Sequence, residues 1–478
     1  MNTEYIYKSP LSERYASREM SSLFSDENKY ITWRKLWIAL AQAEKHLGLP
    51  ISEEQIQSMQ KNLHELDLDL VAEYEKKFKH DVMAHLHAFG DVCHEAKGIL
   101  HLGATSCFVT DNTDLIQMKE GLHFLHTKIL QVIRHLAEFA EKNASVACLS
   151  YTHLQPAQPT TVGKRACLWI QDLLMDLHDI EDKMHSLKFL GAKGATGTQA
   201  SFLSLFSGDH NKVKQLDLAI AKLMGFDHLI PVSGQTYTRK QDIRVCSVLS
   251  SFAATAHKIA TDIRLLSHLH ELEEPFTEQQ IGSSAMPYKR NPTRSERICG
   301  LARFVISLNE NPLYTAANQW LERTLDDSSN RRLCLPEAFL ASDGIANLLI
   351  HTLSGLVIHP KSIRKNLLQE LPFVATENIL MHAVKKGGNR QSLHESLRKY
   401  SRETMEQIHE GGSALELIQK IISDPIFYIT REEIEEMMRE EHFIGRASKQ
   451  VAEFMHDEVH PLLKRYAHVS IYKALVFV

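Results

Sequence analysis

The sequence predicts a mostly helical protein, because long segments lack helix-breaking residues and repeat apolar residues at helical spacing. The clearest segment lies between Pro231 and Pro275, where Gly234 is the only glycine. Apolar residues recur within it at steps of three and four: Val245, Leu249, Phe252, Ala256, Ile259, Ile263 and Leu266. This spacing places them on one face of a helix. We expect a helix of about 35 residues, roughly 50 Å long.

Four more segments are expected to form helices. The segment 113–147 is interrupted only by Gly121, and the segment 164–190 contains neither glycine nor proline. Shorter helices are expected at 293–308 and 336–356. Helices as long as the first two cannot close a compact core within one small domain, so they favour a parallel-sided bundle that other subunits could complete.

Shorter helices are expected on both sides of this bundle. Near the N-terminus, one helical stripe ends before Gly48: Trp33, Leu36, Trp37, Leu40, Glu44 and Leu47. After His359-Pro360 the sequence returns to short helical segments and charged runs. Few segments alternate with a period of two, so little sheet is expected. We predict an all-α chain with a helical N-terminal domain at 1–110, a central long-helix domain at 111–358 and a helical C-terminal domain at 359–478.

Composition narrows the possible classes. The net charge of -5 and the pI of about 6.6 give no reason to expect a protein that binds nucleic acid or a membrane surface. The 7 cysteines form no C-x-x-C motif and the 27 histidines form no H-E-x-x-H motif, so no metal site is expected. Scattered cysteines fit a reducing compartment. The first ten residues lack the apolar core of a secretory signal, and we expect a cytoplasmic protein.

One loop between two expected helices carries a dense set of polar residues. The segment 282–292 reads Gly-Ser-Ser-Ala-Met-Pro-Tyr-Lys-Arg-Asn-Pro. A serine can act as a general base only where its alkoxide is stabilised, and Lys289 and nearby backbone N–H groups could supply that positive potential. Lys289 and Asn291 could also hold a carboxylate that gains charge when a proton leaves the adjacent carbon. The alternative is a polar surface loop without function.

This loop resembles the signature of the fumarase/aspartase superfamily, whose members release fumarate from succinyl-type substrates. Three other segments resemble one family within it, the adenylosuccinate lyases, in its animal-type form: 9–17, 80–85 and 151–160. The similarity covers essentially the whole chain. It implies an elongated subunit of three domains whose long central helices form the bundle of a homotetramer.

The resemblance implies a β-elimination that needs no cofactor. Members of the family convert adenylosuccinate to AMP and fumarate, and succinyl-aminoimidazole-carboxamide ribotide to AICAR and fumarate, in purine and AMP biosynthesis. The base would be Ser283, with Ser284 as the alternative hydroxyl. The acid would be His153, since imidazolium is a suitable proton donor near neutral pH. Without the resemblance, His153 would be interpreted as a helix-end histidine bonded to the backbone.

The resemblance also implies contacts to the succinyl carboxylates. Lys289 would take part in catalysis and, with Asn291, hold a carboxylate. Thr105 and Ser106 would contact the same carboxylates, because a pair of small hydroxyls after a glycine can approach closely and donate two hydrogen bonds. These two residues could instead cap a helix. Gln235, just before the longest expected helix, would bind substrate or act as a cap.

The rest of the nucleotide would be bound by residues from several segments. Those that match the family are Arg14, Tyr15, Lys79, His80, Asp81, Thr152, Arg297, Arg323, Ser328 and Arg332. Lys79 stands where arginine is common, which keeps the charge but loses the bidentate fork. Taken alone, the segment 322–332 would be a solvated loop or a salt-bridge network.

The predicted site residues are spread from Arg14 to Arg332, which is awkward for one elongated subunit. It is natural if each site forms where three subunits meet, as in the family, and a monomer is then expected to be inactive. Two other hypotheses remain. The chain could be another fumarate-releasing member, such as an argininosuccinate lyase, or a non-catalytic helical scaffold. A scaffold has no need of Ser283, His153, Lys289 and Asn291, so their presence argues against it.

Overall fold

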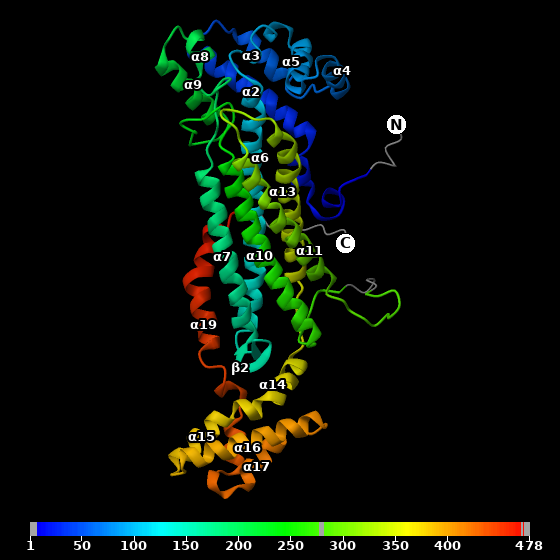
Figure 1. Cartoon of the computed structure of the whole chain (residues 1–478), viewed down its shortest axis with the longest axis vertical. Helices are drawn as coiled ribbons and strands as arrows, with labels where there is room; N and C mark the ends of the chain where they lie inside the picture. The colour runs from blue at the N-terminus through cyan, green and yellow to red at the C-terminus, as the bar shows by residue number, and fades with distance from the viewer. Residues whose placement is uncertain (1–6, 277–281, 470–471, 473–478) are drawn as a thin grey trace.

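The computed structural model describes residues 7–276, 282–469 and 472 and has the shape of a long rod (Figure 1). Five long helices run along the middle: α6 (Ser106–Lys142), α7 (Val162–Ser186), α10 (Lys240–His268), α11 (Thr293–Leu308) and α13 (Asp326–Leu353). Their contacting faces form one continuous apolar core. The expected all-α fold with a long-helix bundle is confirmed.

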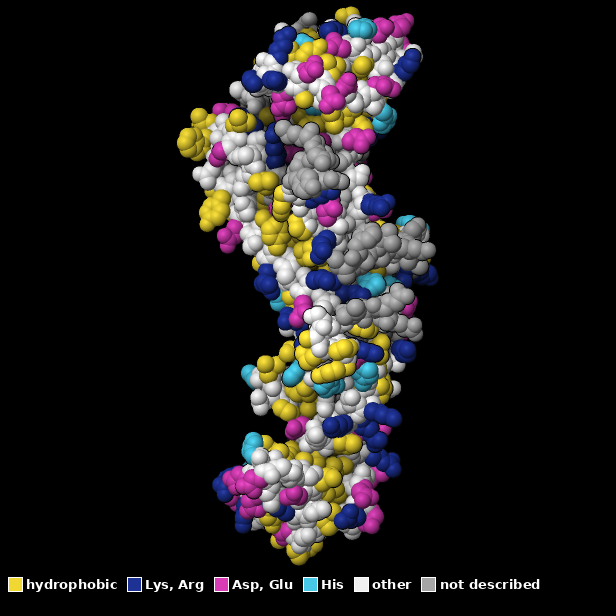
Figure 2. All heavy atoms as spheres, turned by 90° about the vertical axis from the view of Figure 1, so that its right-hand side faces the viewer, with side chains coloured by type: hydrophobic (Ala, Val, Ile, Leu, Met, Phe, Trp, Pro, Cys, Tyr) yellow, Lys and Arg dark blue, Asp and Glu magenta, His cyan; other side chains and the backbone are white. Residues whose placement is uncertain are grey.

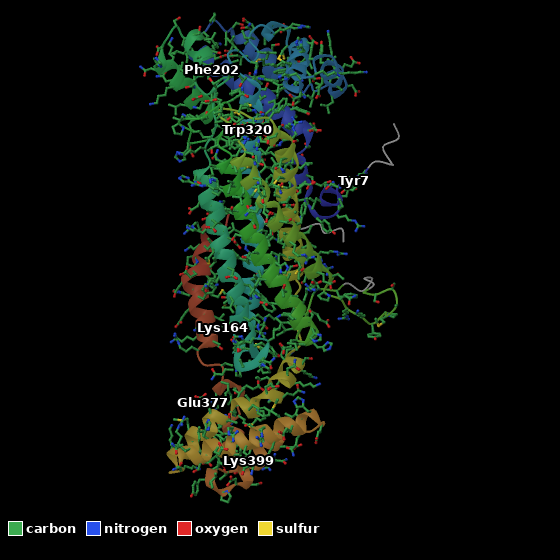
Figure 3. The ribbon with its side chains drawn as sticks, in the orientation of Figure 1. Tyr7, Lys164, Phe202, Trp320, Glu377 and Lys399 are labelled. Atoms are coloured by element: carbon green, nitrogen blue, oxygen red, sulfur yellow. The ribbon has the colours of Figure 1, made fainter. Side chains whose placement is uncertain are left out.

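The helices at the N-terminal end of the rod are shorter than α6, α7 and α10. They are η2 (Leu11–Tyr15), α1 (Arg18–Leu23), α2 (Asp26–His46), α3 (Glu53–Lys61), α4 (Leu68–Phe78), α5 (Asp81–Val92) and η3 (His94–Ala96). Two helices from the middle of the chain lie at the same end, α8 (Ala200–Leu205) and α9 (His210–Leu223). The α8 residue Phe202 is buried there (Figure 3). Many of these helices begin at a side-chain cap, such as Ser25 before α2 and Ser52 before α3.

The opposite end of the rod is a separate small helical body with its own apolar cluster. Its elements are α14 (Pro360–Val374), α15 (Thr376–Lys385), α16 (Arg390–His409), α17 (Leu415–Ser423), η4 (Pro425–Phe427), α18 (Arg431–Met437) and η5 (Glu440–His442). The chain then returns along the bundle as α19 (Ala447–Phe454), η6 (Met455–Val459) and α20 (His460–Arg465), with α19 beside α7 (Figure 1). Residues 447–465 therefore pack on the central core.

The described strands are short and lie below the bundle. β1 (Ala147–Thr152) pairs antiparallel with β2 (Gln155–Thr161), and the two-residue β3 (Leu272–Glu273) pairs with β4 (Val357–Ile358). The connection between β1 and β2 is His153-Leu154, and both residues have positive φ. A two-residue turn with positive φ at both positions matches the right-handed twist of a hairpin. Asn-Gly is the usual sequence there because these two residues adopt positive φ more readily than His or Leu does. The side chains at this tip are therefore held in a strained backbone.

Two helix starts and the order of helix lengths differ from the prediction. The helix expected at 113–147 begins earlier, at Ser106, and α6 rather than α10 is the longest described helix, with 37 residues against 29. The helix expected at 336–356 begins at Asp326, so that Pro336 lies inside α13. Proline disfavours a helix interior, but the first turns of α13 are anchored by buried ion pairs through Asp327 and Arg331.

Helix α13 is apolar and almost enclosed by its neighbours. Among the described helices it alone has the length and hydropathy of a membrane span, yet 83% of that window is buried inside the subunit. A short connection leads from α11 through α12 (Glu310–Ala317) to its first turn. Helix α13 is thus the central element of the core, and its first two turns carry two of the predicted site residues, Ser328 and Arg332.

A buried carboxyl group in α2 predicts how stability depends on pH. The side chain of Glu44 is fully buried, its oxygens have no hydrogen-bond partner among the described residues, and burial raises its pKa to about 8. In the unfolded chain this carboxyl group loses its proton near pH 4.5, whereas in the folded protein it keeps the proton up to about pH 8. The free energy of unfolding therefore falls as the pH rises from about 4.5 towards 8. We expect Glu44→Gln, which mimics the neutral acid, to stabilise the protein by roughly 3 kcal/mol at pH 8.

Thermal unfolding of Glu44→Gln and wild type, measured at pH 5 and pH 8, checks this effect. The variant should unfold at a higher temperature at pH 8, and the difference should shrink at pH 5, where the native glutamate is already protonated. An equal difference at both values would mean that Glu44 does not titrate with folding.

Candidate functional site

A large cleft lies between the N-terminal helices and the upper end of the bundle. Its volume is about 1010 Å³, and it is bounded by α2, the α4–α5 corner, the start of α6, the segment before α10 and the start of α13. Eight of the predicted residues line it: Lys79, His80, Asp81, Ser106, Gln235, Arg323, Ser328 and Arg332. Residues far apart in the sequence thus meet around one cavity.

The α4–α5 corner presents three of these residues. Lys79 ends α4 in the left-handed conformation, and His80 is the N-cap of α5. The His80 Nδ1 atom accepts a hydrogen bond from the Met83 N–H group at 3.4 Å, and its Nε2 atom lies 3.4 Å from the Ser106 hydroxyl. Because Nδ1 is an acceptor, a neutral His80 carries its proton on Nε2, which points to Ser106.

The other side of the cleft is the start of α6. Thr105 holds the N-cap position, but its side chain accepts no hydrogen bond from the first turn of the helix. The interpretation of Thr105 as a helix cap is therefore not supported. Ser106 follows at the first helical position and lines the cleft. The N-terminal N–H groups and the positive end of the α6 dipole favour an anion here.

Gln235 lies in the segment before α10. Its amide nitrogen donates to the Ala195 carbonyl at 3.0 Å, and its side-chain oxygen is 3.3 Å from the Cys107 sulfur. Arg239 holds the N-cap position of α10, so Gln235 does not cap this helix. The Gln235 N–H group also donates to the Glu322 carbonyl at 3.0 Å, which brings this segment against the turn before α13.

A network of buried ion pairs forms the floor of the cleft. Arg239 pairs with Asp111 at 2.9 Å and with Asp327 at 2.6 Å, and Arg323 pairs with Asp327 at 2.9 Å. A second buried arginine, Arg331, pairs with Asp242 at 2.7 Å and Asp114 at 2.8 Å. The interpretation of 322–332 as a salt-bridge network therefore holds for part of the segment, while Ser328 and Arg332 face the cavity.

The cleft also holds an exposed ion pair between two predicted substrate contacts. Arg332 donates to Asp81 at 3.1 Å, and more than half of the arginine side chain is exposed. Exposed pairs of this kind contribute about 0–1 kcal/mol, so an anionic ligand can draw Arg332 away from Asp81 at little cost.

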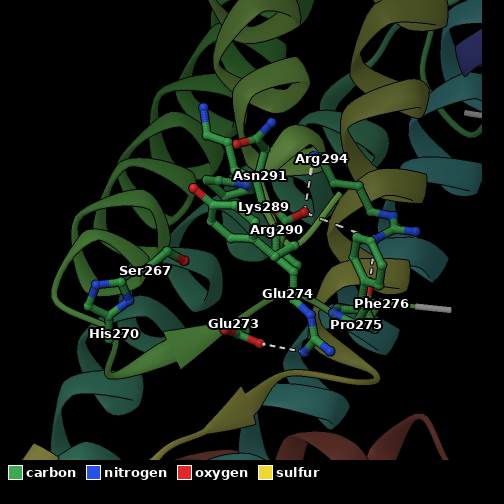
Figure 4. Close-up of a pocket in the computed structure, with 12 residues that line it drawn as sticks. Ser267, His270, Glu273, Glu274, Pro275, Phe276, Lys289, Arg290, Asn291 and Arg294 are labelled. Carbon is green, nitrogen blue, oxygen red and sulfur yellow. Dashed lines mark hydrogen bonds and ion pairs between the residues drawn. The ribbon is translucent and has the colours of Figure 1, made fainter. Parts of the chain in front are cut away.

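A second, smaller cleft lies where the 282–292 loop meets the lower part of the bundle (Figure 4). Its volume is about 400 Å³, and its lining includes Lys289, Asn291 and Glu274. The Asn291 amide donates to the Gly282 carbonyl at 2.9 Å. A Cβ atom at Gly282 would lie 1.9 Å from the Lys289 carbonyl oxygen, so only glycine fits where the two ends of the loop approach.

The geometry of the loop distinguishes its two serines. The Ser283 hydroxyl accepts from the backbone N–H groups of Met286 at 3.1 Å and Ala285 at 3.4 Å. Such groups stabilise negative charge on the oxygen, as a serine base requires. Ser284 is exposed and has no comparable donors among the described residues. The loop itself projects to the side of the bundle (Figure 1).

The remaining predicted residues lie elsewhere. Thr152 and His153 are exposed at the tip of the β1–β2 hairpin, at the lower end of the bundle. His153 is thus a hairpin residue, and the alternative interpretation as a helix-end histidine is wrong. Arg297 is half-buried in the second turn of α11. Arg14 is exposed in η2, beside Tyr15.

Tyr15 is docked on the middle of α13. Its carbonyl oxygen accepts from the Asn347 amide at 3.0 Å, and it packs against Gly344, where a Cβ atom would lie 2.7 Å from the tyrosine Cβ. The predicted residues of one chain thus form separate groups: the upper cleft, the η2 segment, the 282–292 loop and the hairpin tip. Figure 1 shows the loop and the hairpin well below α4, α5 and the start of α6, which bound the upper cleft.

Sequence reasoning missed the buried acids and bases under the cleft: Asp111, Asp114, Arg239, Asp242, Asp327 and Arg331. A signal was present for one of them, because Asp242 lies one helical turn before Val245, on the apolar stripe of α10. A charged residue on a buried stripe predicts a buried ion pair. Among the described residues, no group of three or more His, Cys, Asp or Glu side chains could hold a metal ion.

The chain matches two family models. Residues 9–307 match a model described as lyase, and residues 372–454 match one described as adenylosuccinate lyase C-terminus. The solved structure of 3-carboxy-cis,cis-muconate lactonizing enzyme from Pseudomonas putida has the same fold, with a TM-score of 0.83 at 22% identity over 95% of this chain and 99% of that one. Fumarate lyase from Mesorhizobium sp. BNC1 gives a TM-score of 0.79 at 20% identity, over 95% and 100% of the two chains.

Relatives of higher identity span nearly the whole sequence. Adenylosuccinate lyase of Saccharomyces cerevisiae is 50% identical over 96% of both chains, and that of Schistosoma mansoni is also 50% identical over 96% of both. Adenylosuccinate lyase of Pyrococcus abyssi is 32% identical over 92% of this chain and 95% of its own. The chain therefore belongs to the adenylosuccinate lyase family of the fumarase/aspartase superfamily.

Proposed function

We propose that this chain cleaves adenylosuccinate to AMP and fumarate, and cleaves succinyl-aminoimidazole-carboxamide ribotide to AICAR and fumarate, as an enzyme of purine nucleotide biosynthesis. The observation that carries this proposal is the 50% identity to adenylosuccinate lyases over 96% of the chain. The enzyme is a C–N lyase. An argininosuccinate lyase is not favoured, because the similarity includes the C-terminal region described for adenylosuccinate lyases.

The chemistry follows from the side chains. The Ser283 oxygen removes a proton from the carbon beside a succinyl carboxylate, and its two backbone N–H donors support the charge that the serine carries. The electron pair of that C–H bond becomes the double bond of fumarate as the C–N bond breaks. His153 supplies the proton that the leaving nitrogen accepts. Lys289 and Asn291 stabilise the charge that moves onto the carboxylate.

Each site is proposed to combine residues from three subunits of a homotetramer. The support is that, on one chain, the helices that bound the upper cleft lie apart from the loop and from the hairpin. A second support is the set of large apolar side chains that are exposed on the bundle and its edge: Leu168, Met175, Leu265, Ile306, Trp320 and Leu333. Figure 2 shows apolar side chains reaching the surface along the middle of the rod, and Figure 3 places Trp320 near its upper part.

The proposed location is the cytoplasm. All 7 cysteines are buried and none forms a disulfide, which suits a reducing compartment. The proposed ligands are small nucleotides, and the mildly acidic charge gives no reason to add a nucleic acid or a membrane as a partner.

An assay of the purified protein tests the function. Adenylosuccinate, argininosuccinate and malate are supplied separately, and fumarate is measured together with the mass of the assembly in the same sample. We expect fumarate from adenylosuccinate alone, in a sample with the mass of a tetramer. Fumarate from argininosuccinate, or from none of the three, would overturn the proposal.

A further inference from the structure

Asp327 occupies an unusual position in the upper cleft, because one buried carboxylate serves two arginines. Its Oδ2 atom accepts from Arg239 Nε at 2.8 Å and lies 2.6 Å from Arg239 Nη2. Both of its oxygens also accept from Arg323 Nη1, at 2.9 and 3.2 Å. The Asp327 and Arg239 side chains are each 1% exposed, whereas Arg323 is 24% exposed at the cleft.

Arg239, which holds Asp327, is itself held by α6. Arg239 donates to Asp111 in α6 at 2.9 Å, and Asp111 also accepts from the Tyr237 N–H group at 3.0 Å. The chain of contacts therefore runs from α6 through the start of α10 to the start of α13. Because each charge in it is buried and paired, rotating Asp327 would leave Arg239 partly unpaired, which is costly.

Arg323 is the end of this chain that faces the cavity. Among the described residues, Nη1 is the only nitrogen of its guanidinium that is hydrogen-bonded. Its Nε and Nη2 groups remain for a ligand, and a guanidinium held at one nitrogen presents the others in a defined direction. Such a group suits the planar or tetrahedral oxygens of a carboxylate or a phosphate.

We propose that Asp327 is a positioning residue that orients Arg323 toward the phosphate of the nucleotide, with Arg239 and Asp111 holding Asp327 in place. This proposal rests on the proposed function, which supplies the phosphate-bearing substrate. Asp327 itself touches no substrate. It acts only through the direction in which the Arg323 guanidinium points.

A positioning role and a purely electrostatic role make opposite predictions. Asp327→Asn removes a negative charge from the wall of the cleft, and through charge alone this would strengthen the binding of a phosphate and lower KM. If Asp327 orients Arg323, the same change frees the guanidinium and raises KM. The sign of the change in KM therefore separates the two roles.

The first measurement is steady-state kinetics with adenylosuccinate. Asp327→Asn should raise KM by about tenfold or more, because misplacement of a binding group by 1 Å can cost up to about a hundredfold. Its kcat should stay within about threefold of wild type, since Ser283 and His153 are unchanged. An unchanged or lowered KM, or a loss confined to kcat, would overturn the proposal.

Binding of AMP and adenosine shows whether the phosphate is the group concerned. By calorimetry, Asp327→Asn should bind AMP about tenfold more weakly than wild type does and bind adenosine equally well. Equally weaker binding of both ligands would show that Asp327 does not act on the phosphate. Because this readout needs no turnover, it also separates the two claims. Wild-type protein that binds AMP but releases no fumarate would refute the proposed function alone.

A double-mutant cycle tests whether Asp327 acts through Arg323. Arg323→Gln should raise KM at least as much as Asp327→Asn does, and the double variant should be no worse than Arg323→Gln. Independent, additive effects would contradict the proposal. Glu181→Gln is the matched control, because Glu181 also accepts from two side chains, His126 and Tyr466, but lies away from both clefts. It should leave KM unchanged.

A milder variant covers the case in which Asp327→Asn fails to assemble. Arg239→Lys keeps the buried charge but loses the paired contacts to Asp327, so Asp327 is held less firmly. It should raise the KM for adenylosuccinate in the same direction by a smaller factor. A variant that assembles normally and keeps the wild-type KM would count against the chain of contacts from Arg239 to Arg323.

Discussion

Ser283→Ala and His153→Ala should each lower the turnover of adenylosuccinate by about 100- to 10,000-fold, the range typical of removing a general base or a general acid. Two backbone N–H groups donate hydrogen bonds to the Ser283 hydroxyl oxygen, and they would stabilise the negative charge of its alkoxide. His153 lies at a strained hairpin tip, and its side chain is exposed in the single subunit rather than packed in the core. Strained positions of this kind often serve function.

The measurement is kcat for each variant, with the mass of the assembly and the unfolding temperature determined on the same samples. Neither side chain lies in the apolar core, so both variants should assemble and unfold as wild type does. Ser284→Ala distinguishes the two hydroxyls and should lose little activity. A variant of Ser283 or His153 that keeps a near wild-type rate would show that the role assigned to it is wrong.

A subunit kept from associating should release essentially no fumarate. On one chain, the loop with the proposed base Ser283 and the hairpin with the proposed acid His153 lie apart from the cleft with the proposed phosphate contacts. Met175→Asp places a charge on an exposed apolar position of α7 and should weaken association. Activity per subunit should fall to less than about one hundredth, as for loss of a catalytic group.

The control for this prediction places the same charge on the small body at the far end of the rod. Leu415 is also more than half exposed, but it lies in α17, outside the bundle. Leu415→Asp should leave both assembly and activity unchanged. A Met175→Asp monomer with full activity would refute the sharing of sites between subunits.

Helical periodicity predicted the long-helix bundle because apolar residues at steps of three and four leave few alternatives. It located α11 to the residue and failed at the start of α13, where the sequence from Asp326 onward is charged and Pro336 suggests a beginning. The charges there pair with partners on α6 and α10, among them Asp114 and Asp242. Such partners are distant in the sequence, so no local pattern reveals them.

The candidate site was predictable only as a set of segments. The loop at 282–292 and the segment at 80–85 could be identified from their residues, but no feature of the sequence placed His80 next to Ser106, or Gln235 next to Glu322. These contacts depend on how the helices pack. The resemblance named Ser283 as the base with Ser284 as the alternative, and the two backbone N–H groups that donate to the Ser283 hydroxyl support the first assignment.

Each site is proposed to take its base and its acid from different copies of the chain. Equal amounts of Ser283→Ala and His153→Ala protein, each inactive alone, can be dissociated, mixed and allowed to reassemble. If each site draws the two residues from different subunits, roughly a quarter of the sites contain both native residues, and about a quarter of the wild-type activity should return. Activity that stays at the level of the separate variants would show that both residues come from one chain and would contradict the sharing of each site between subunits.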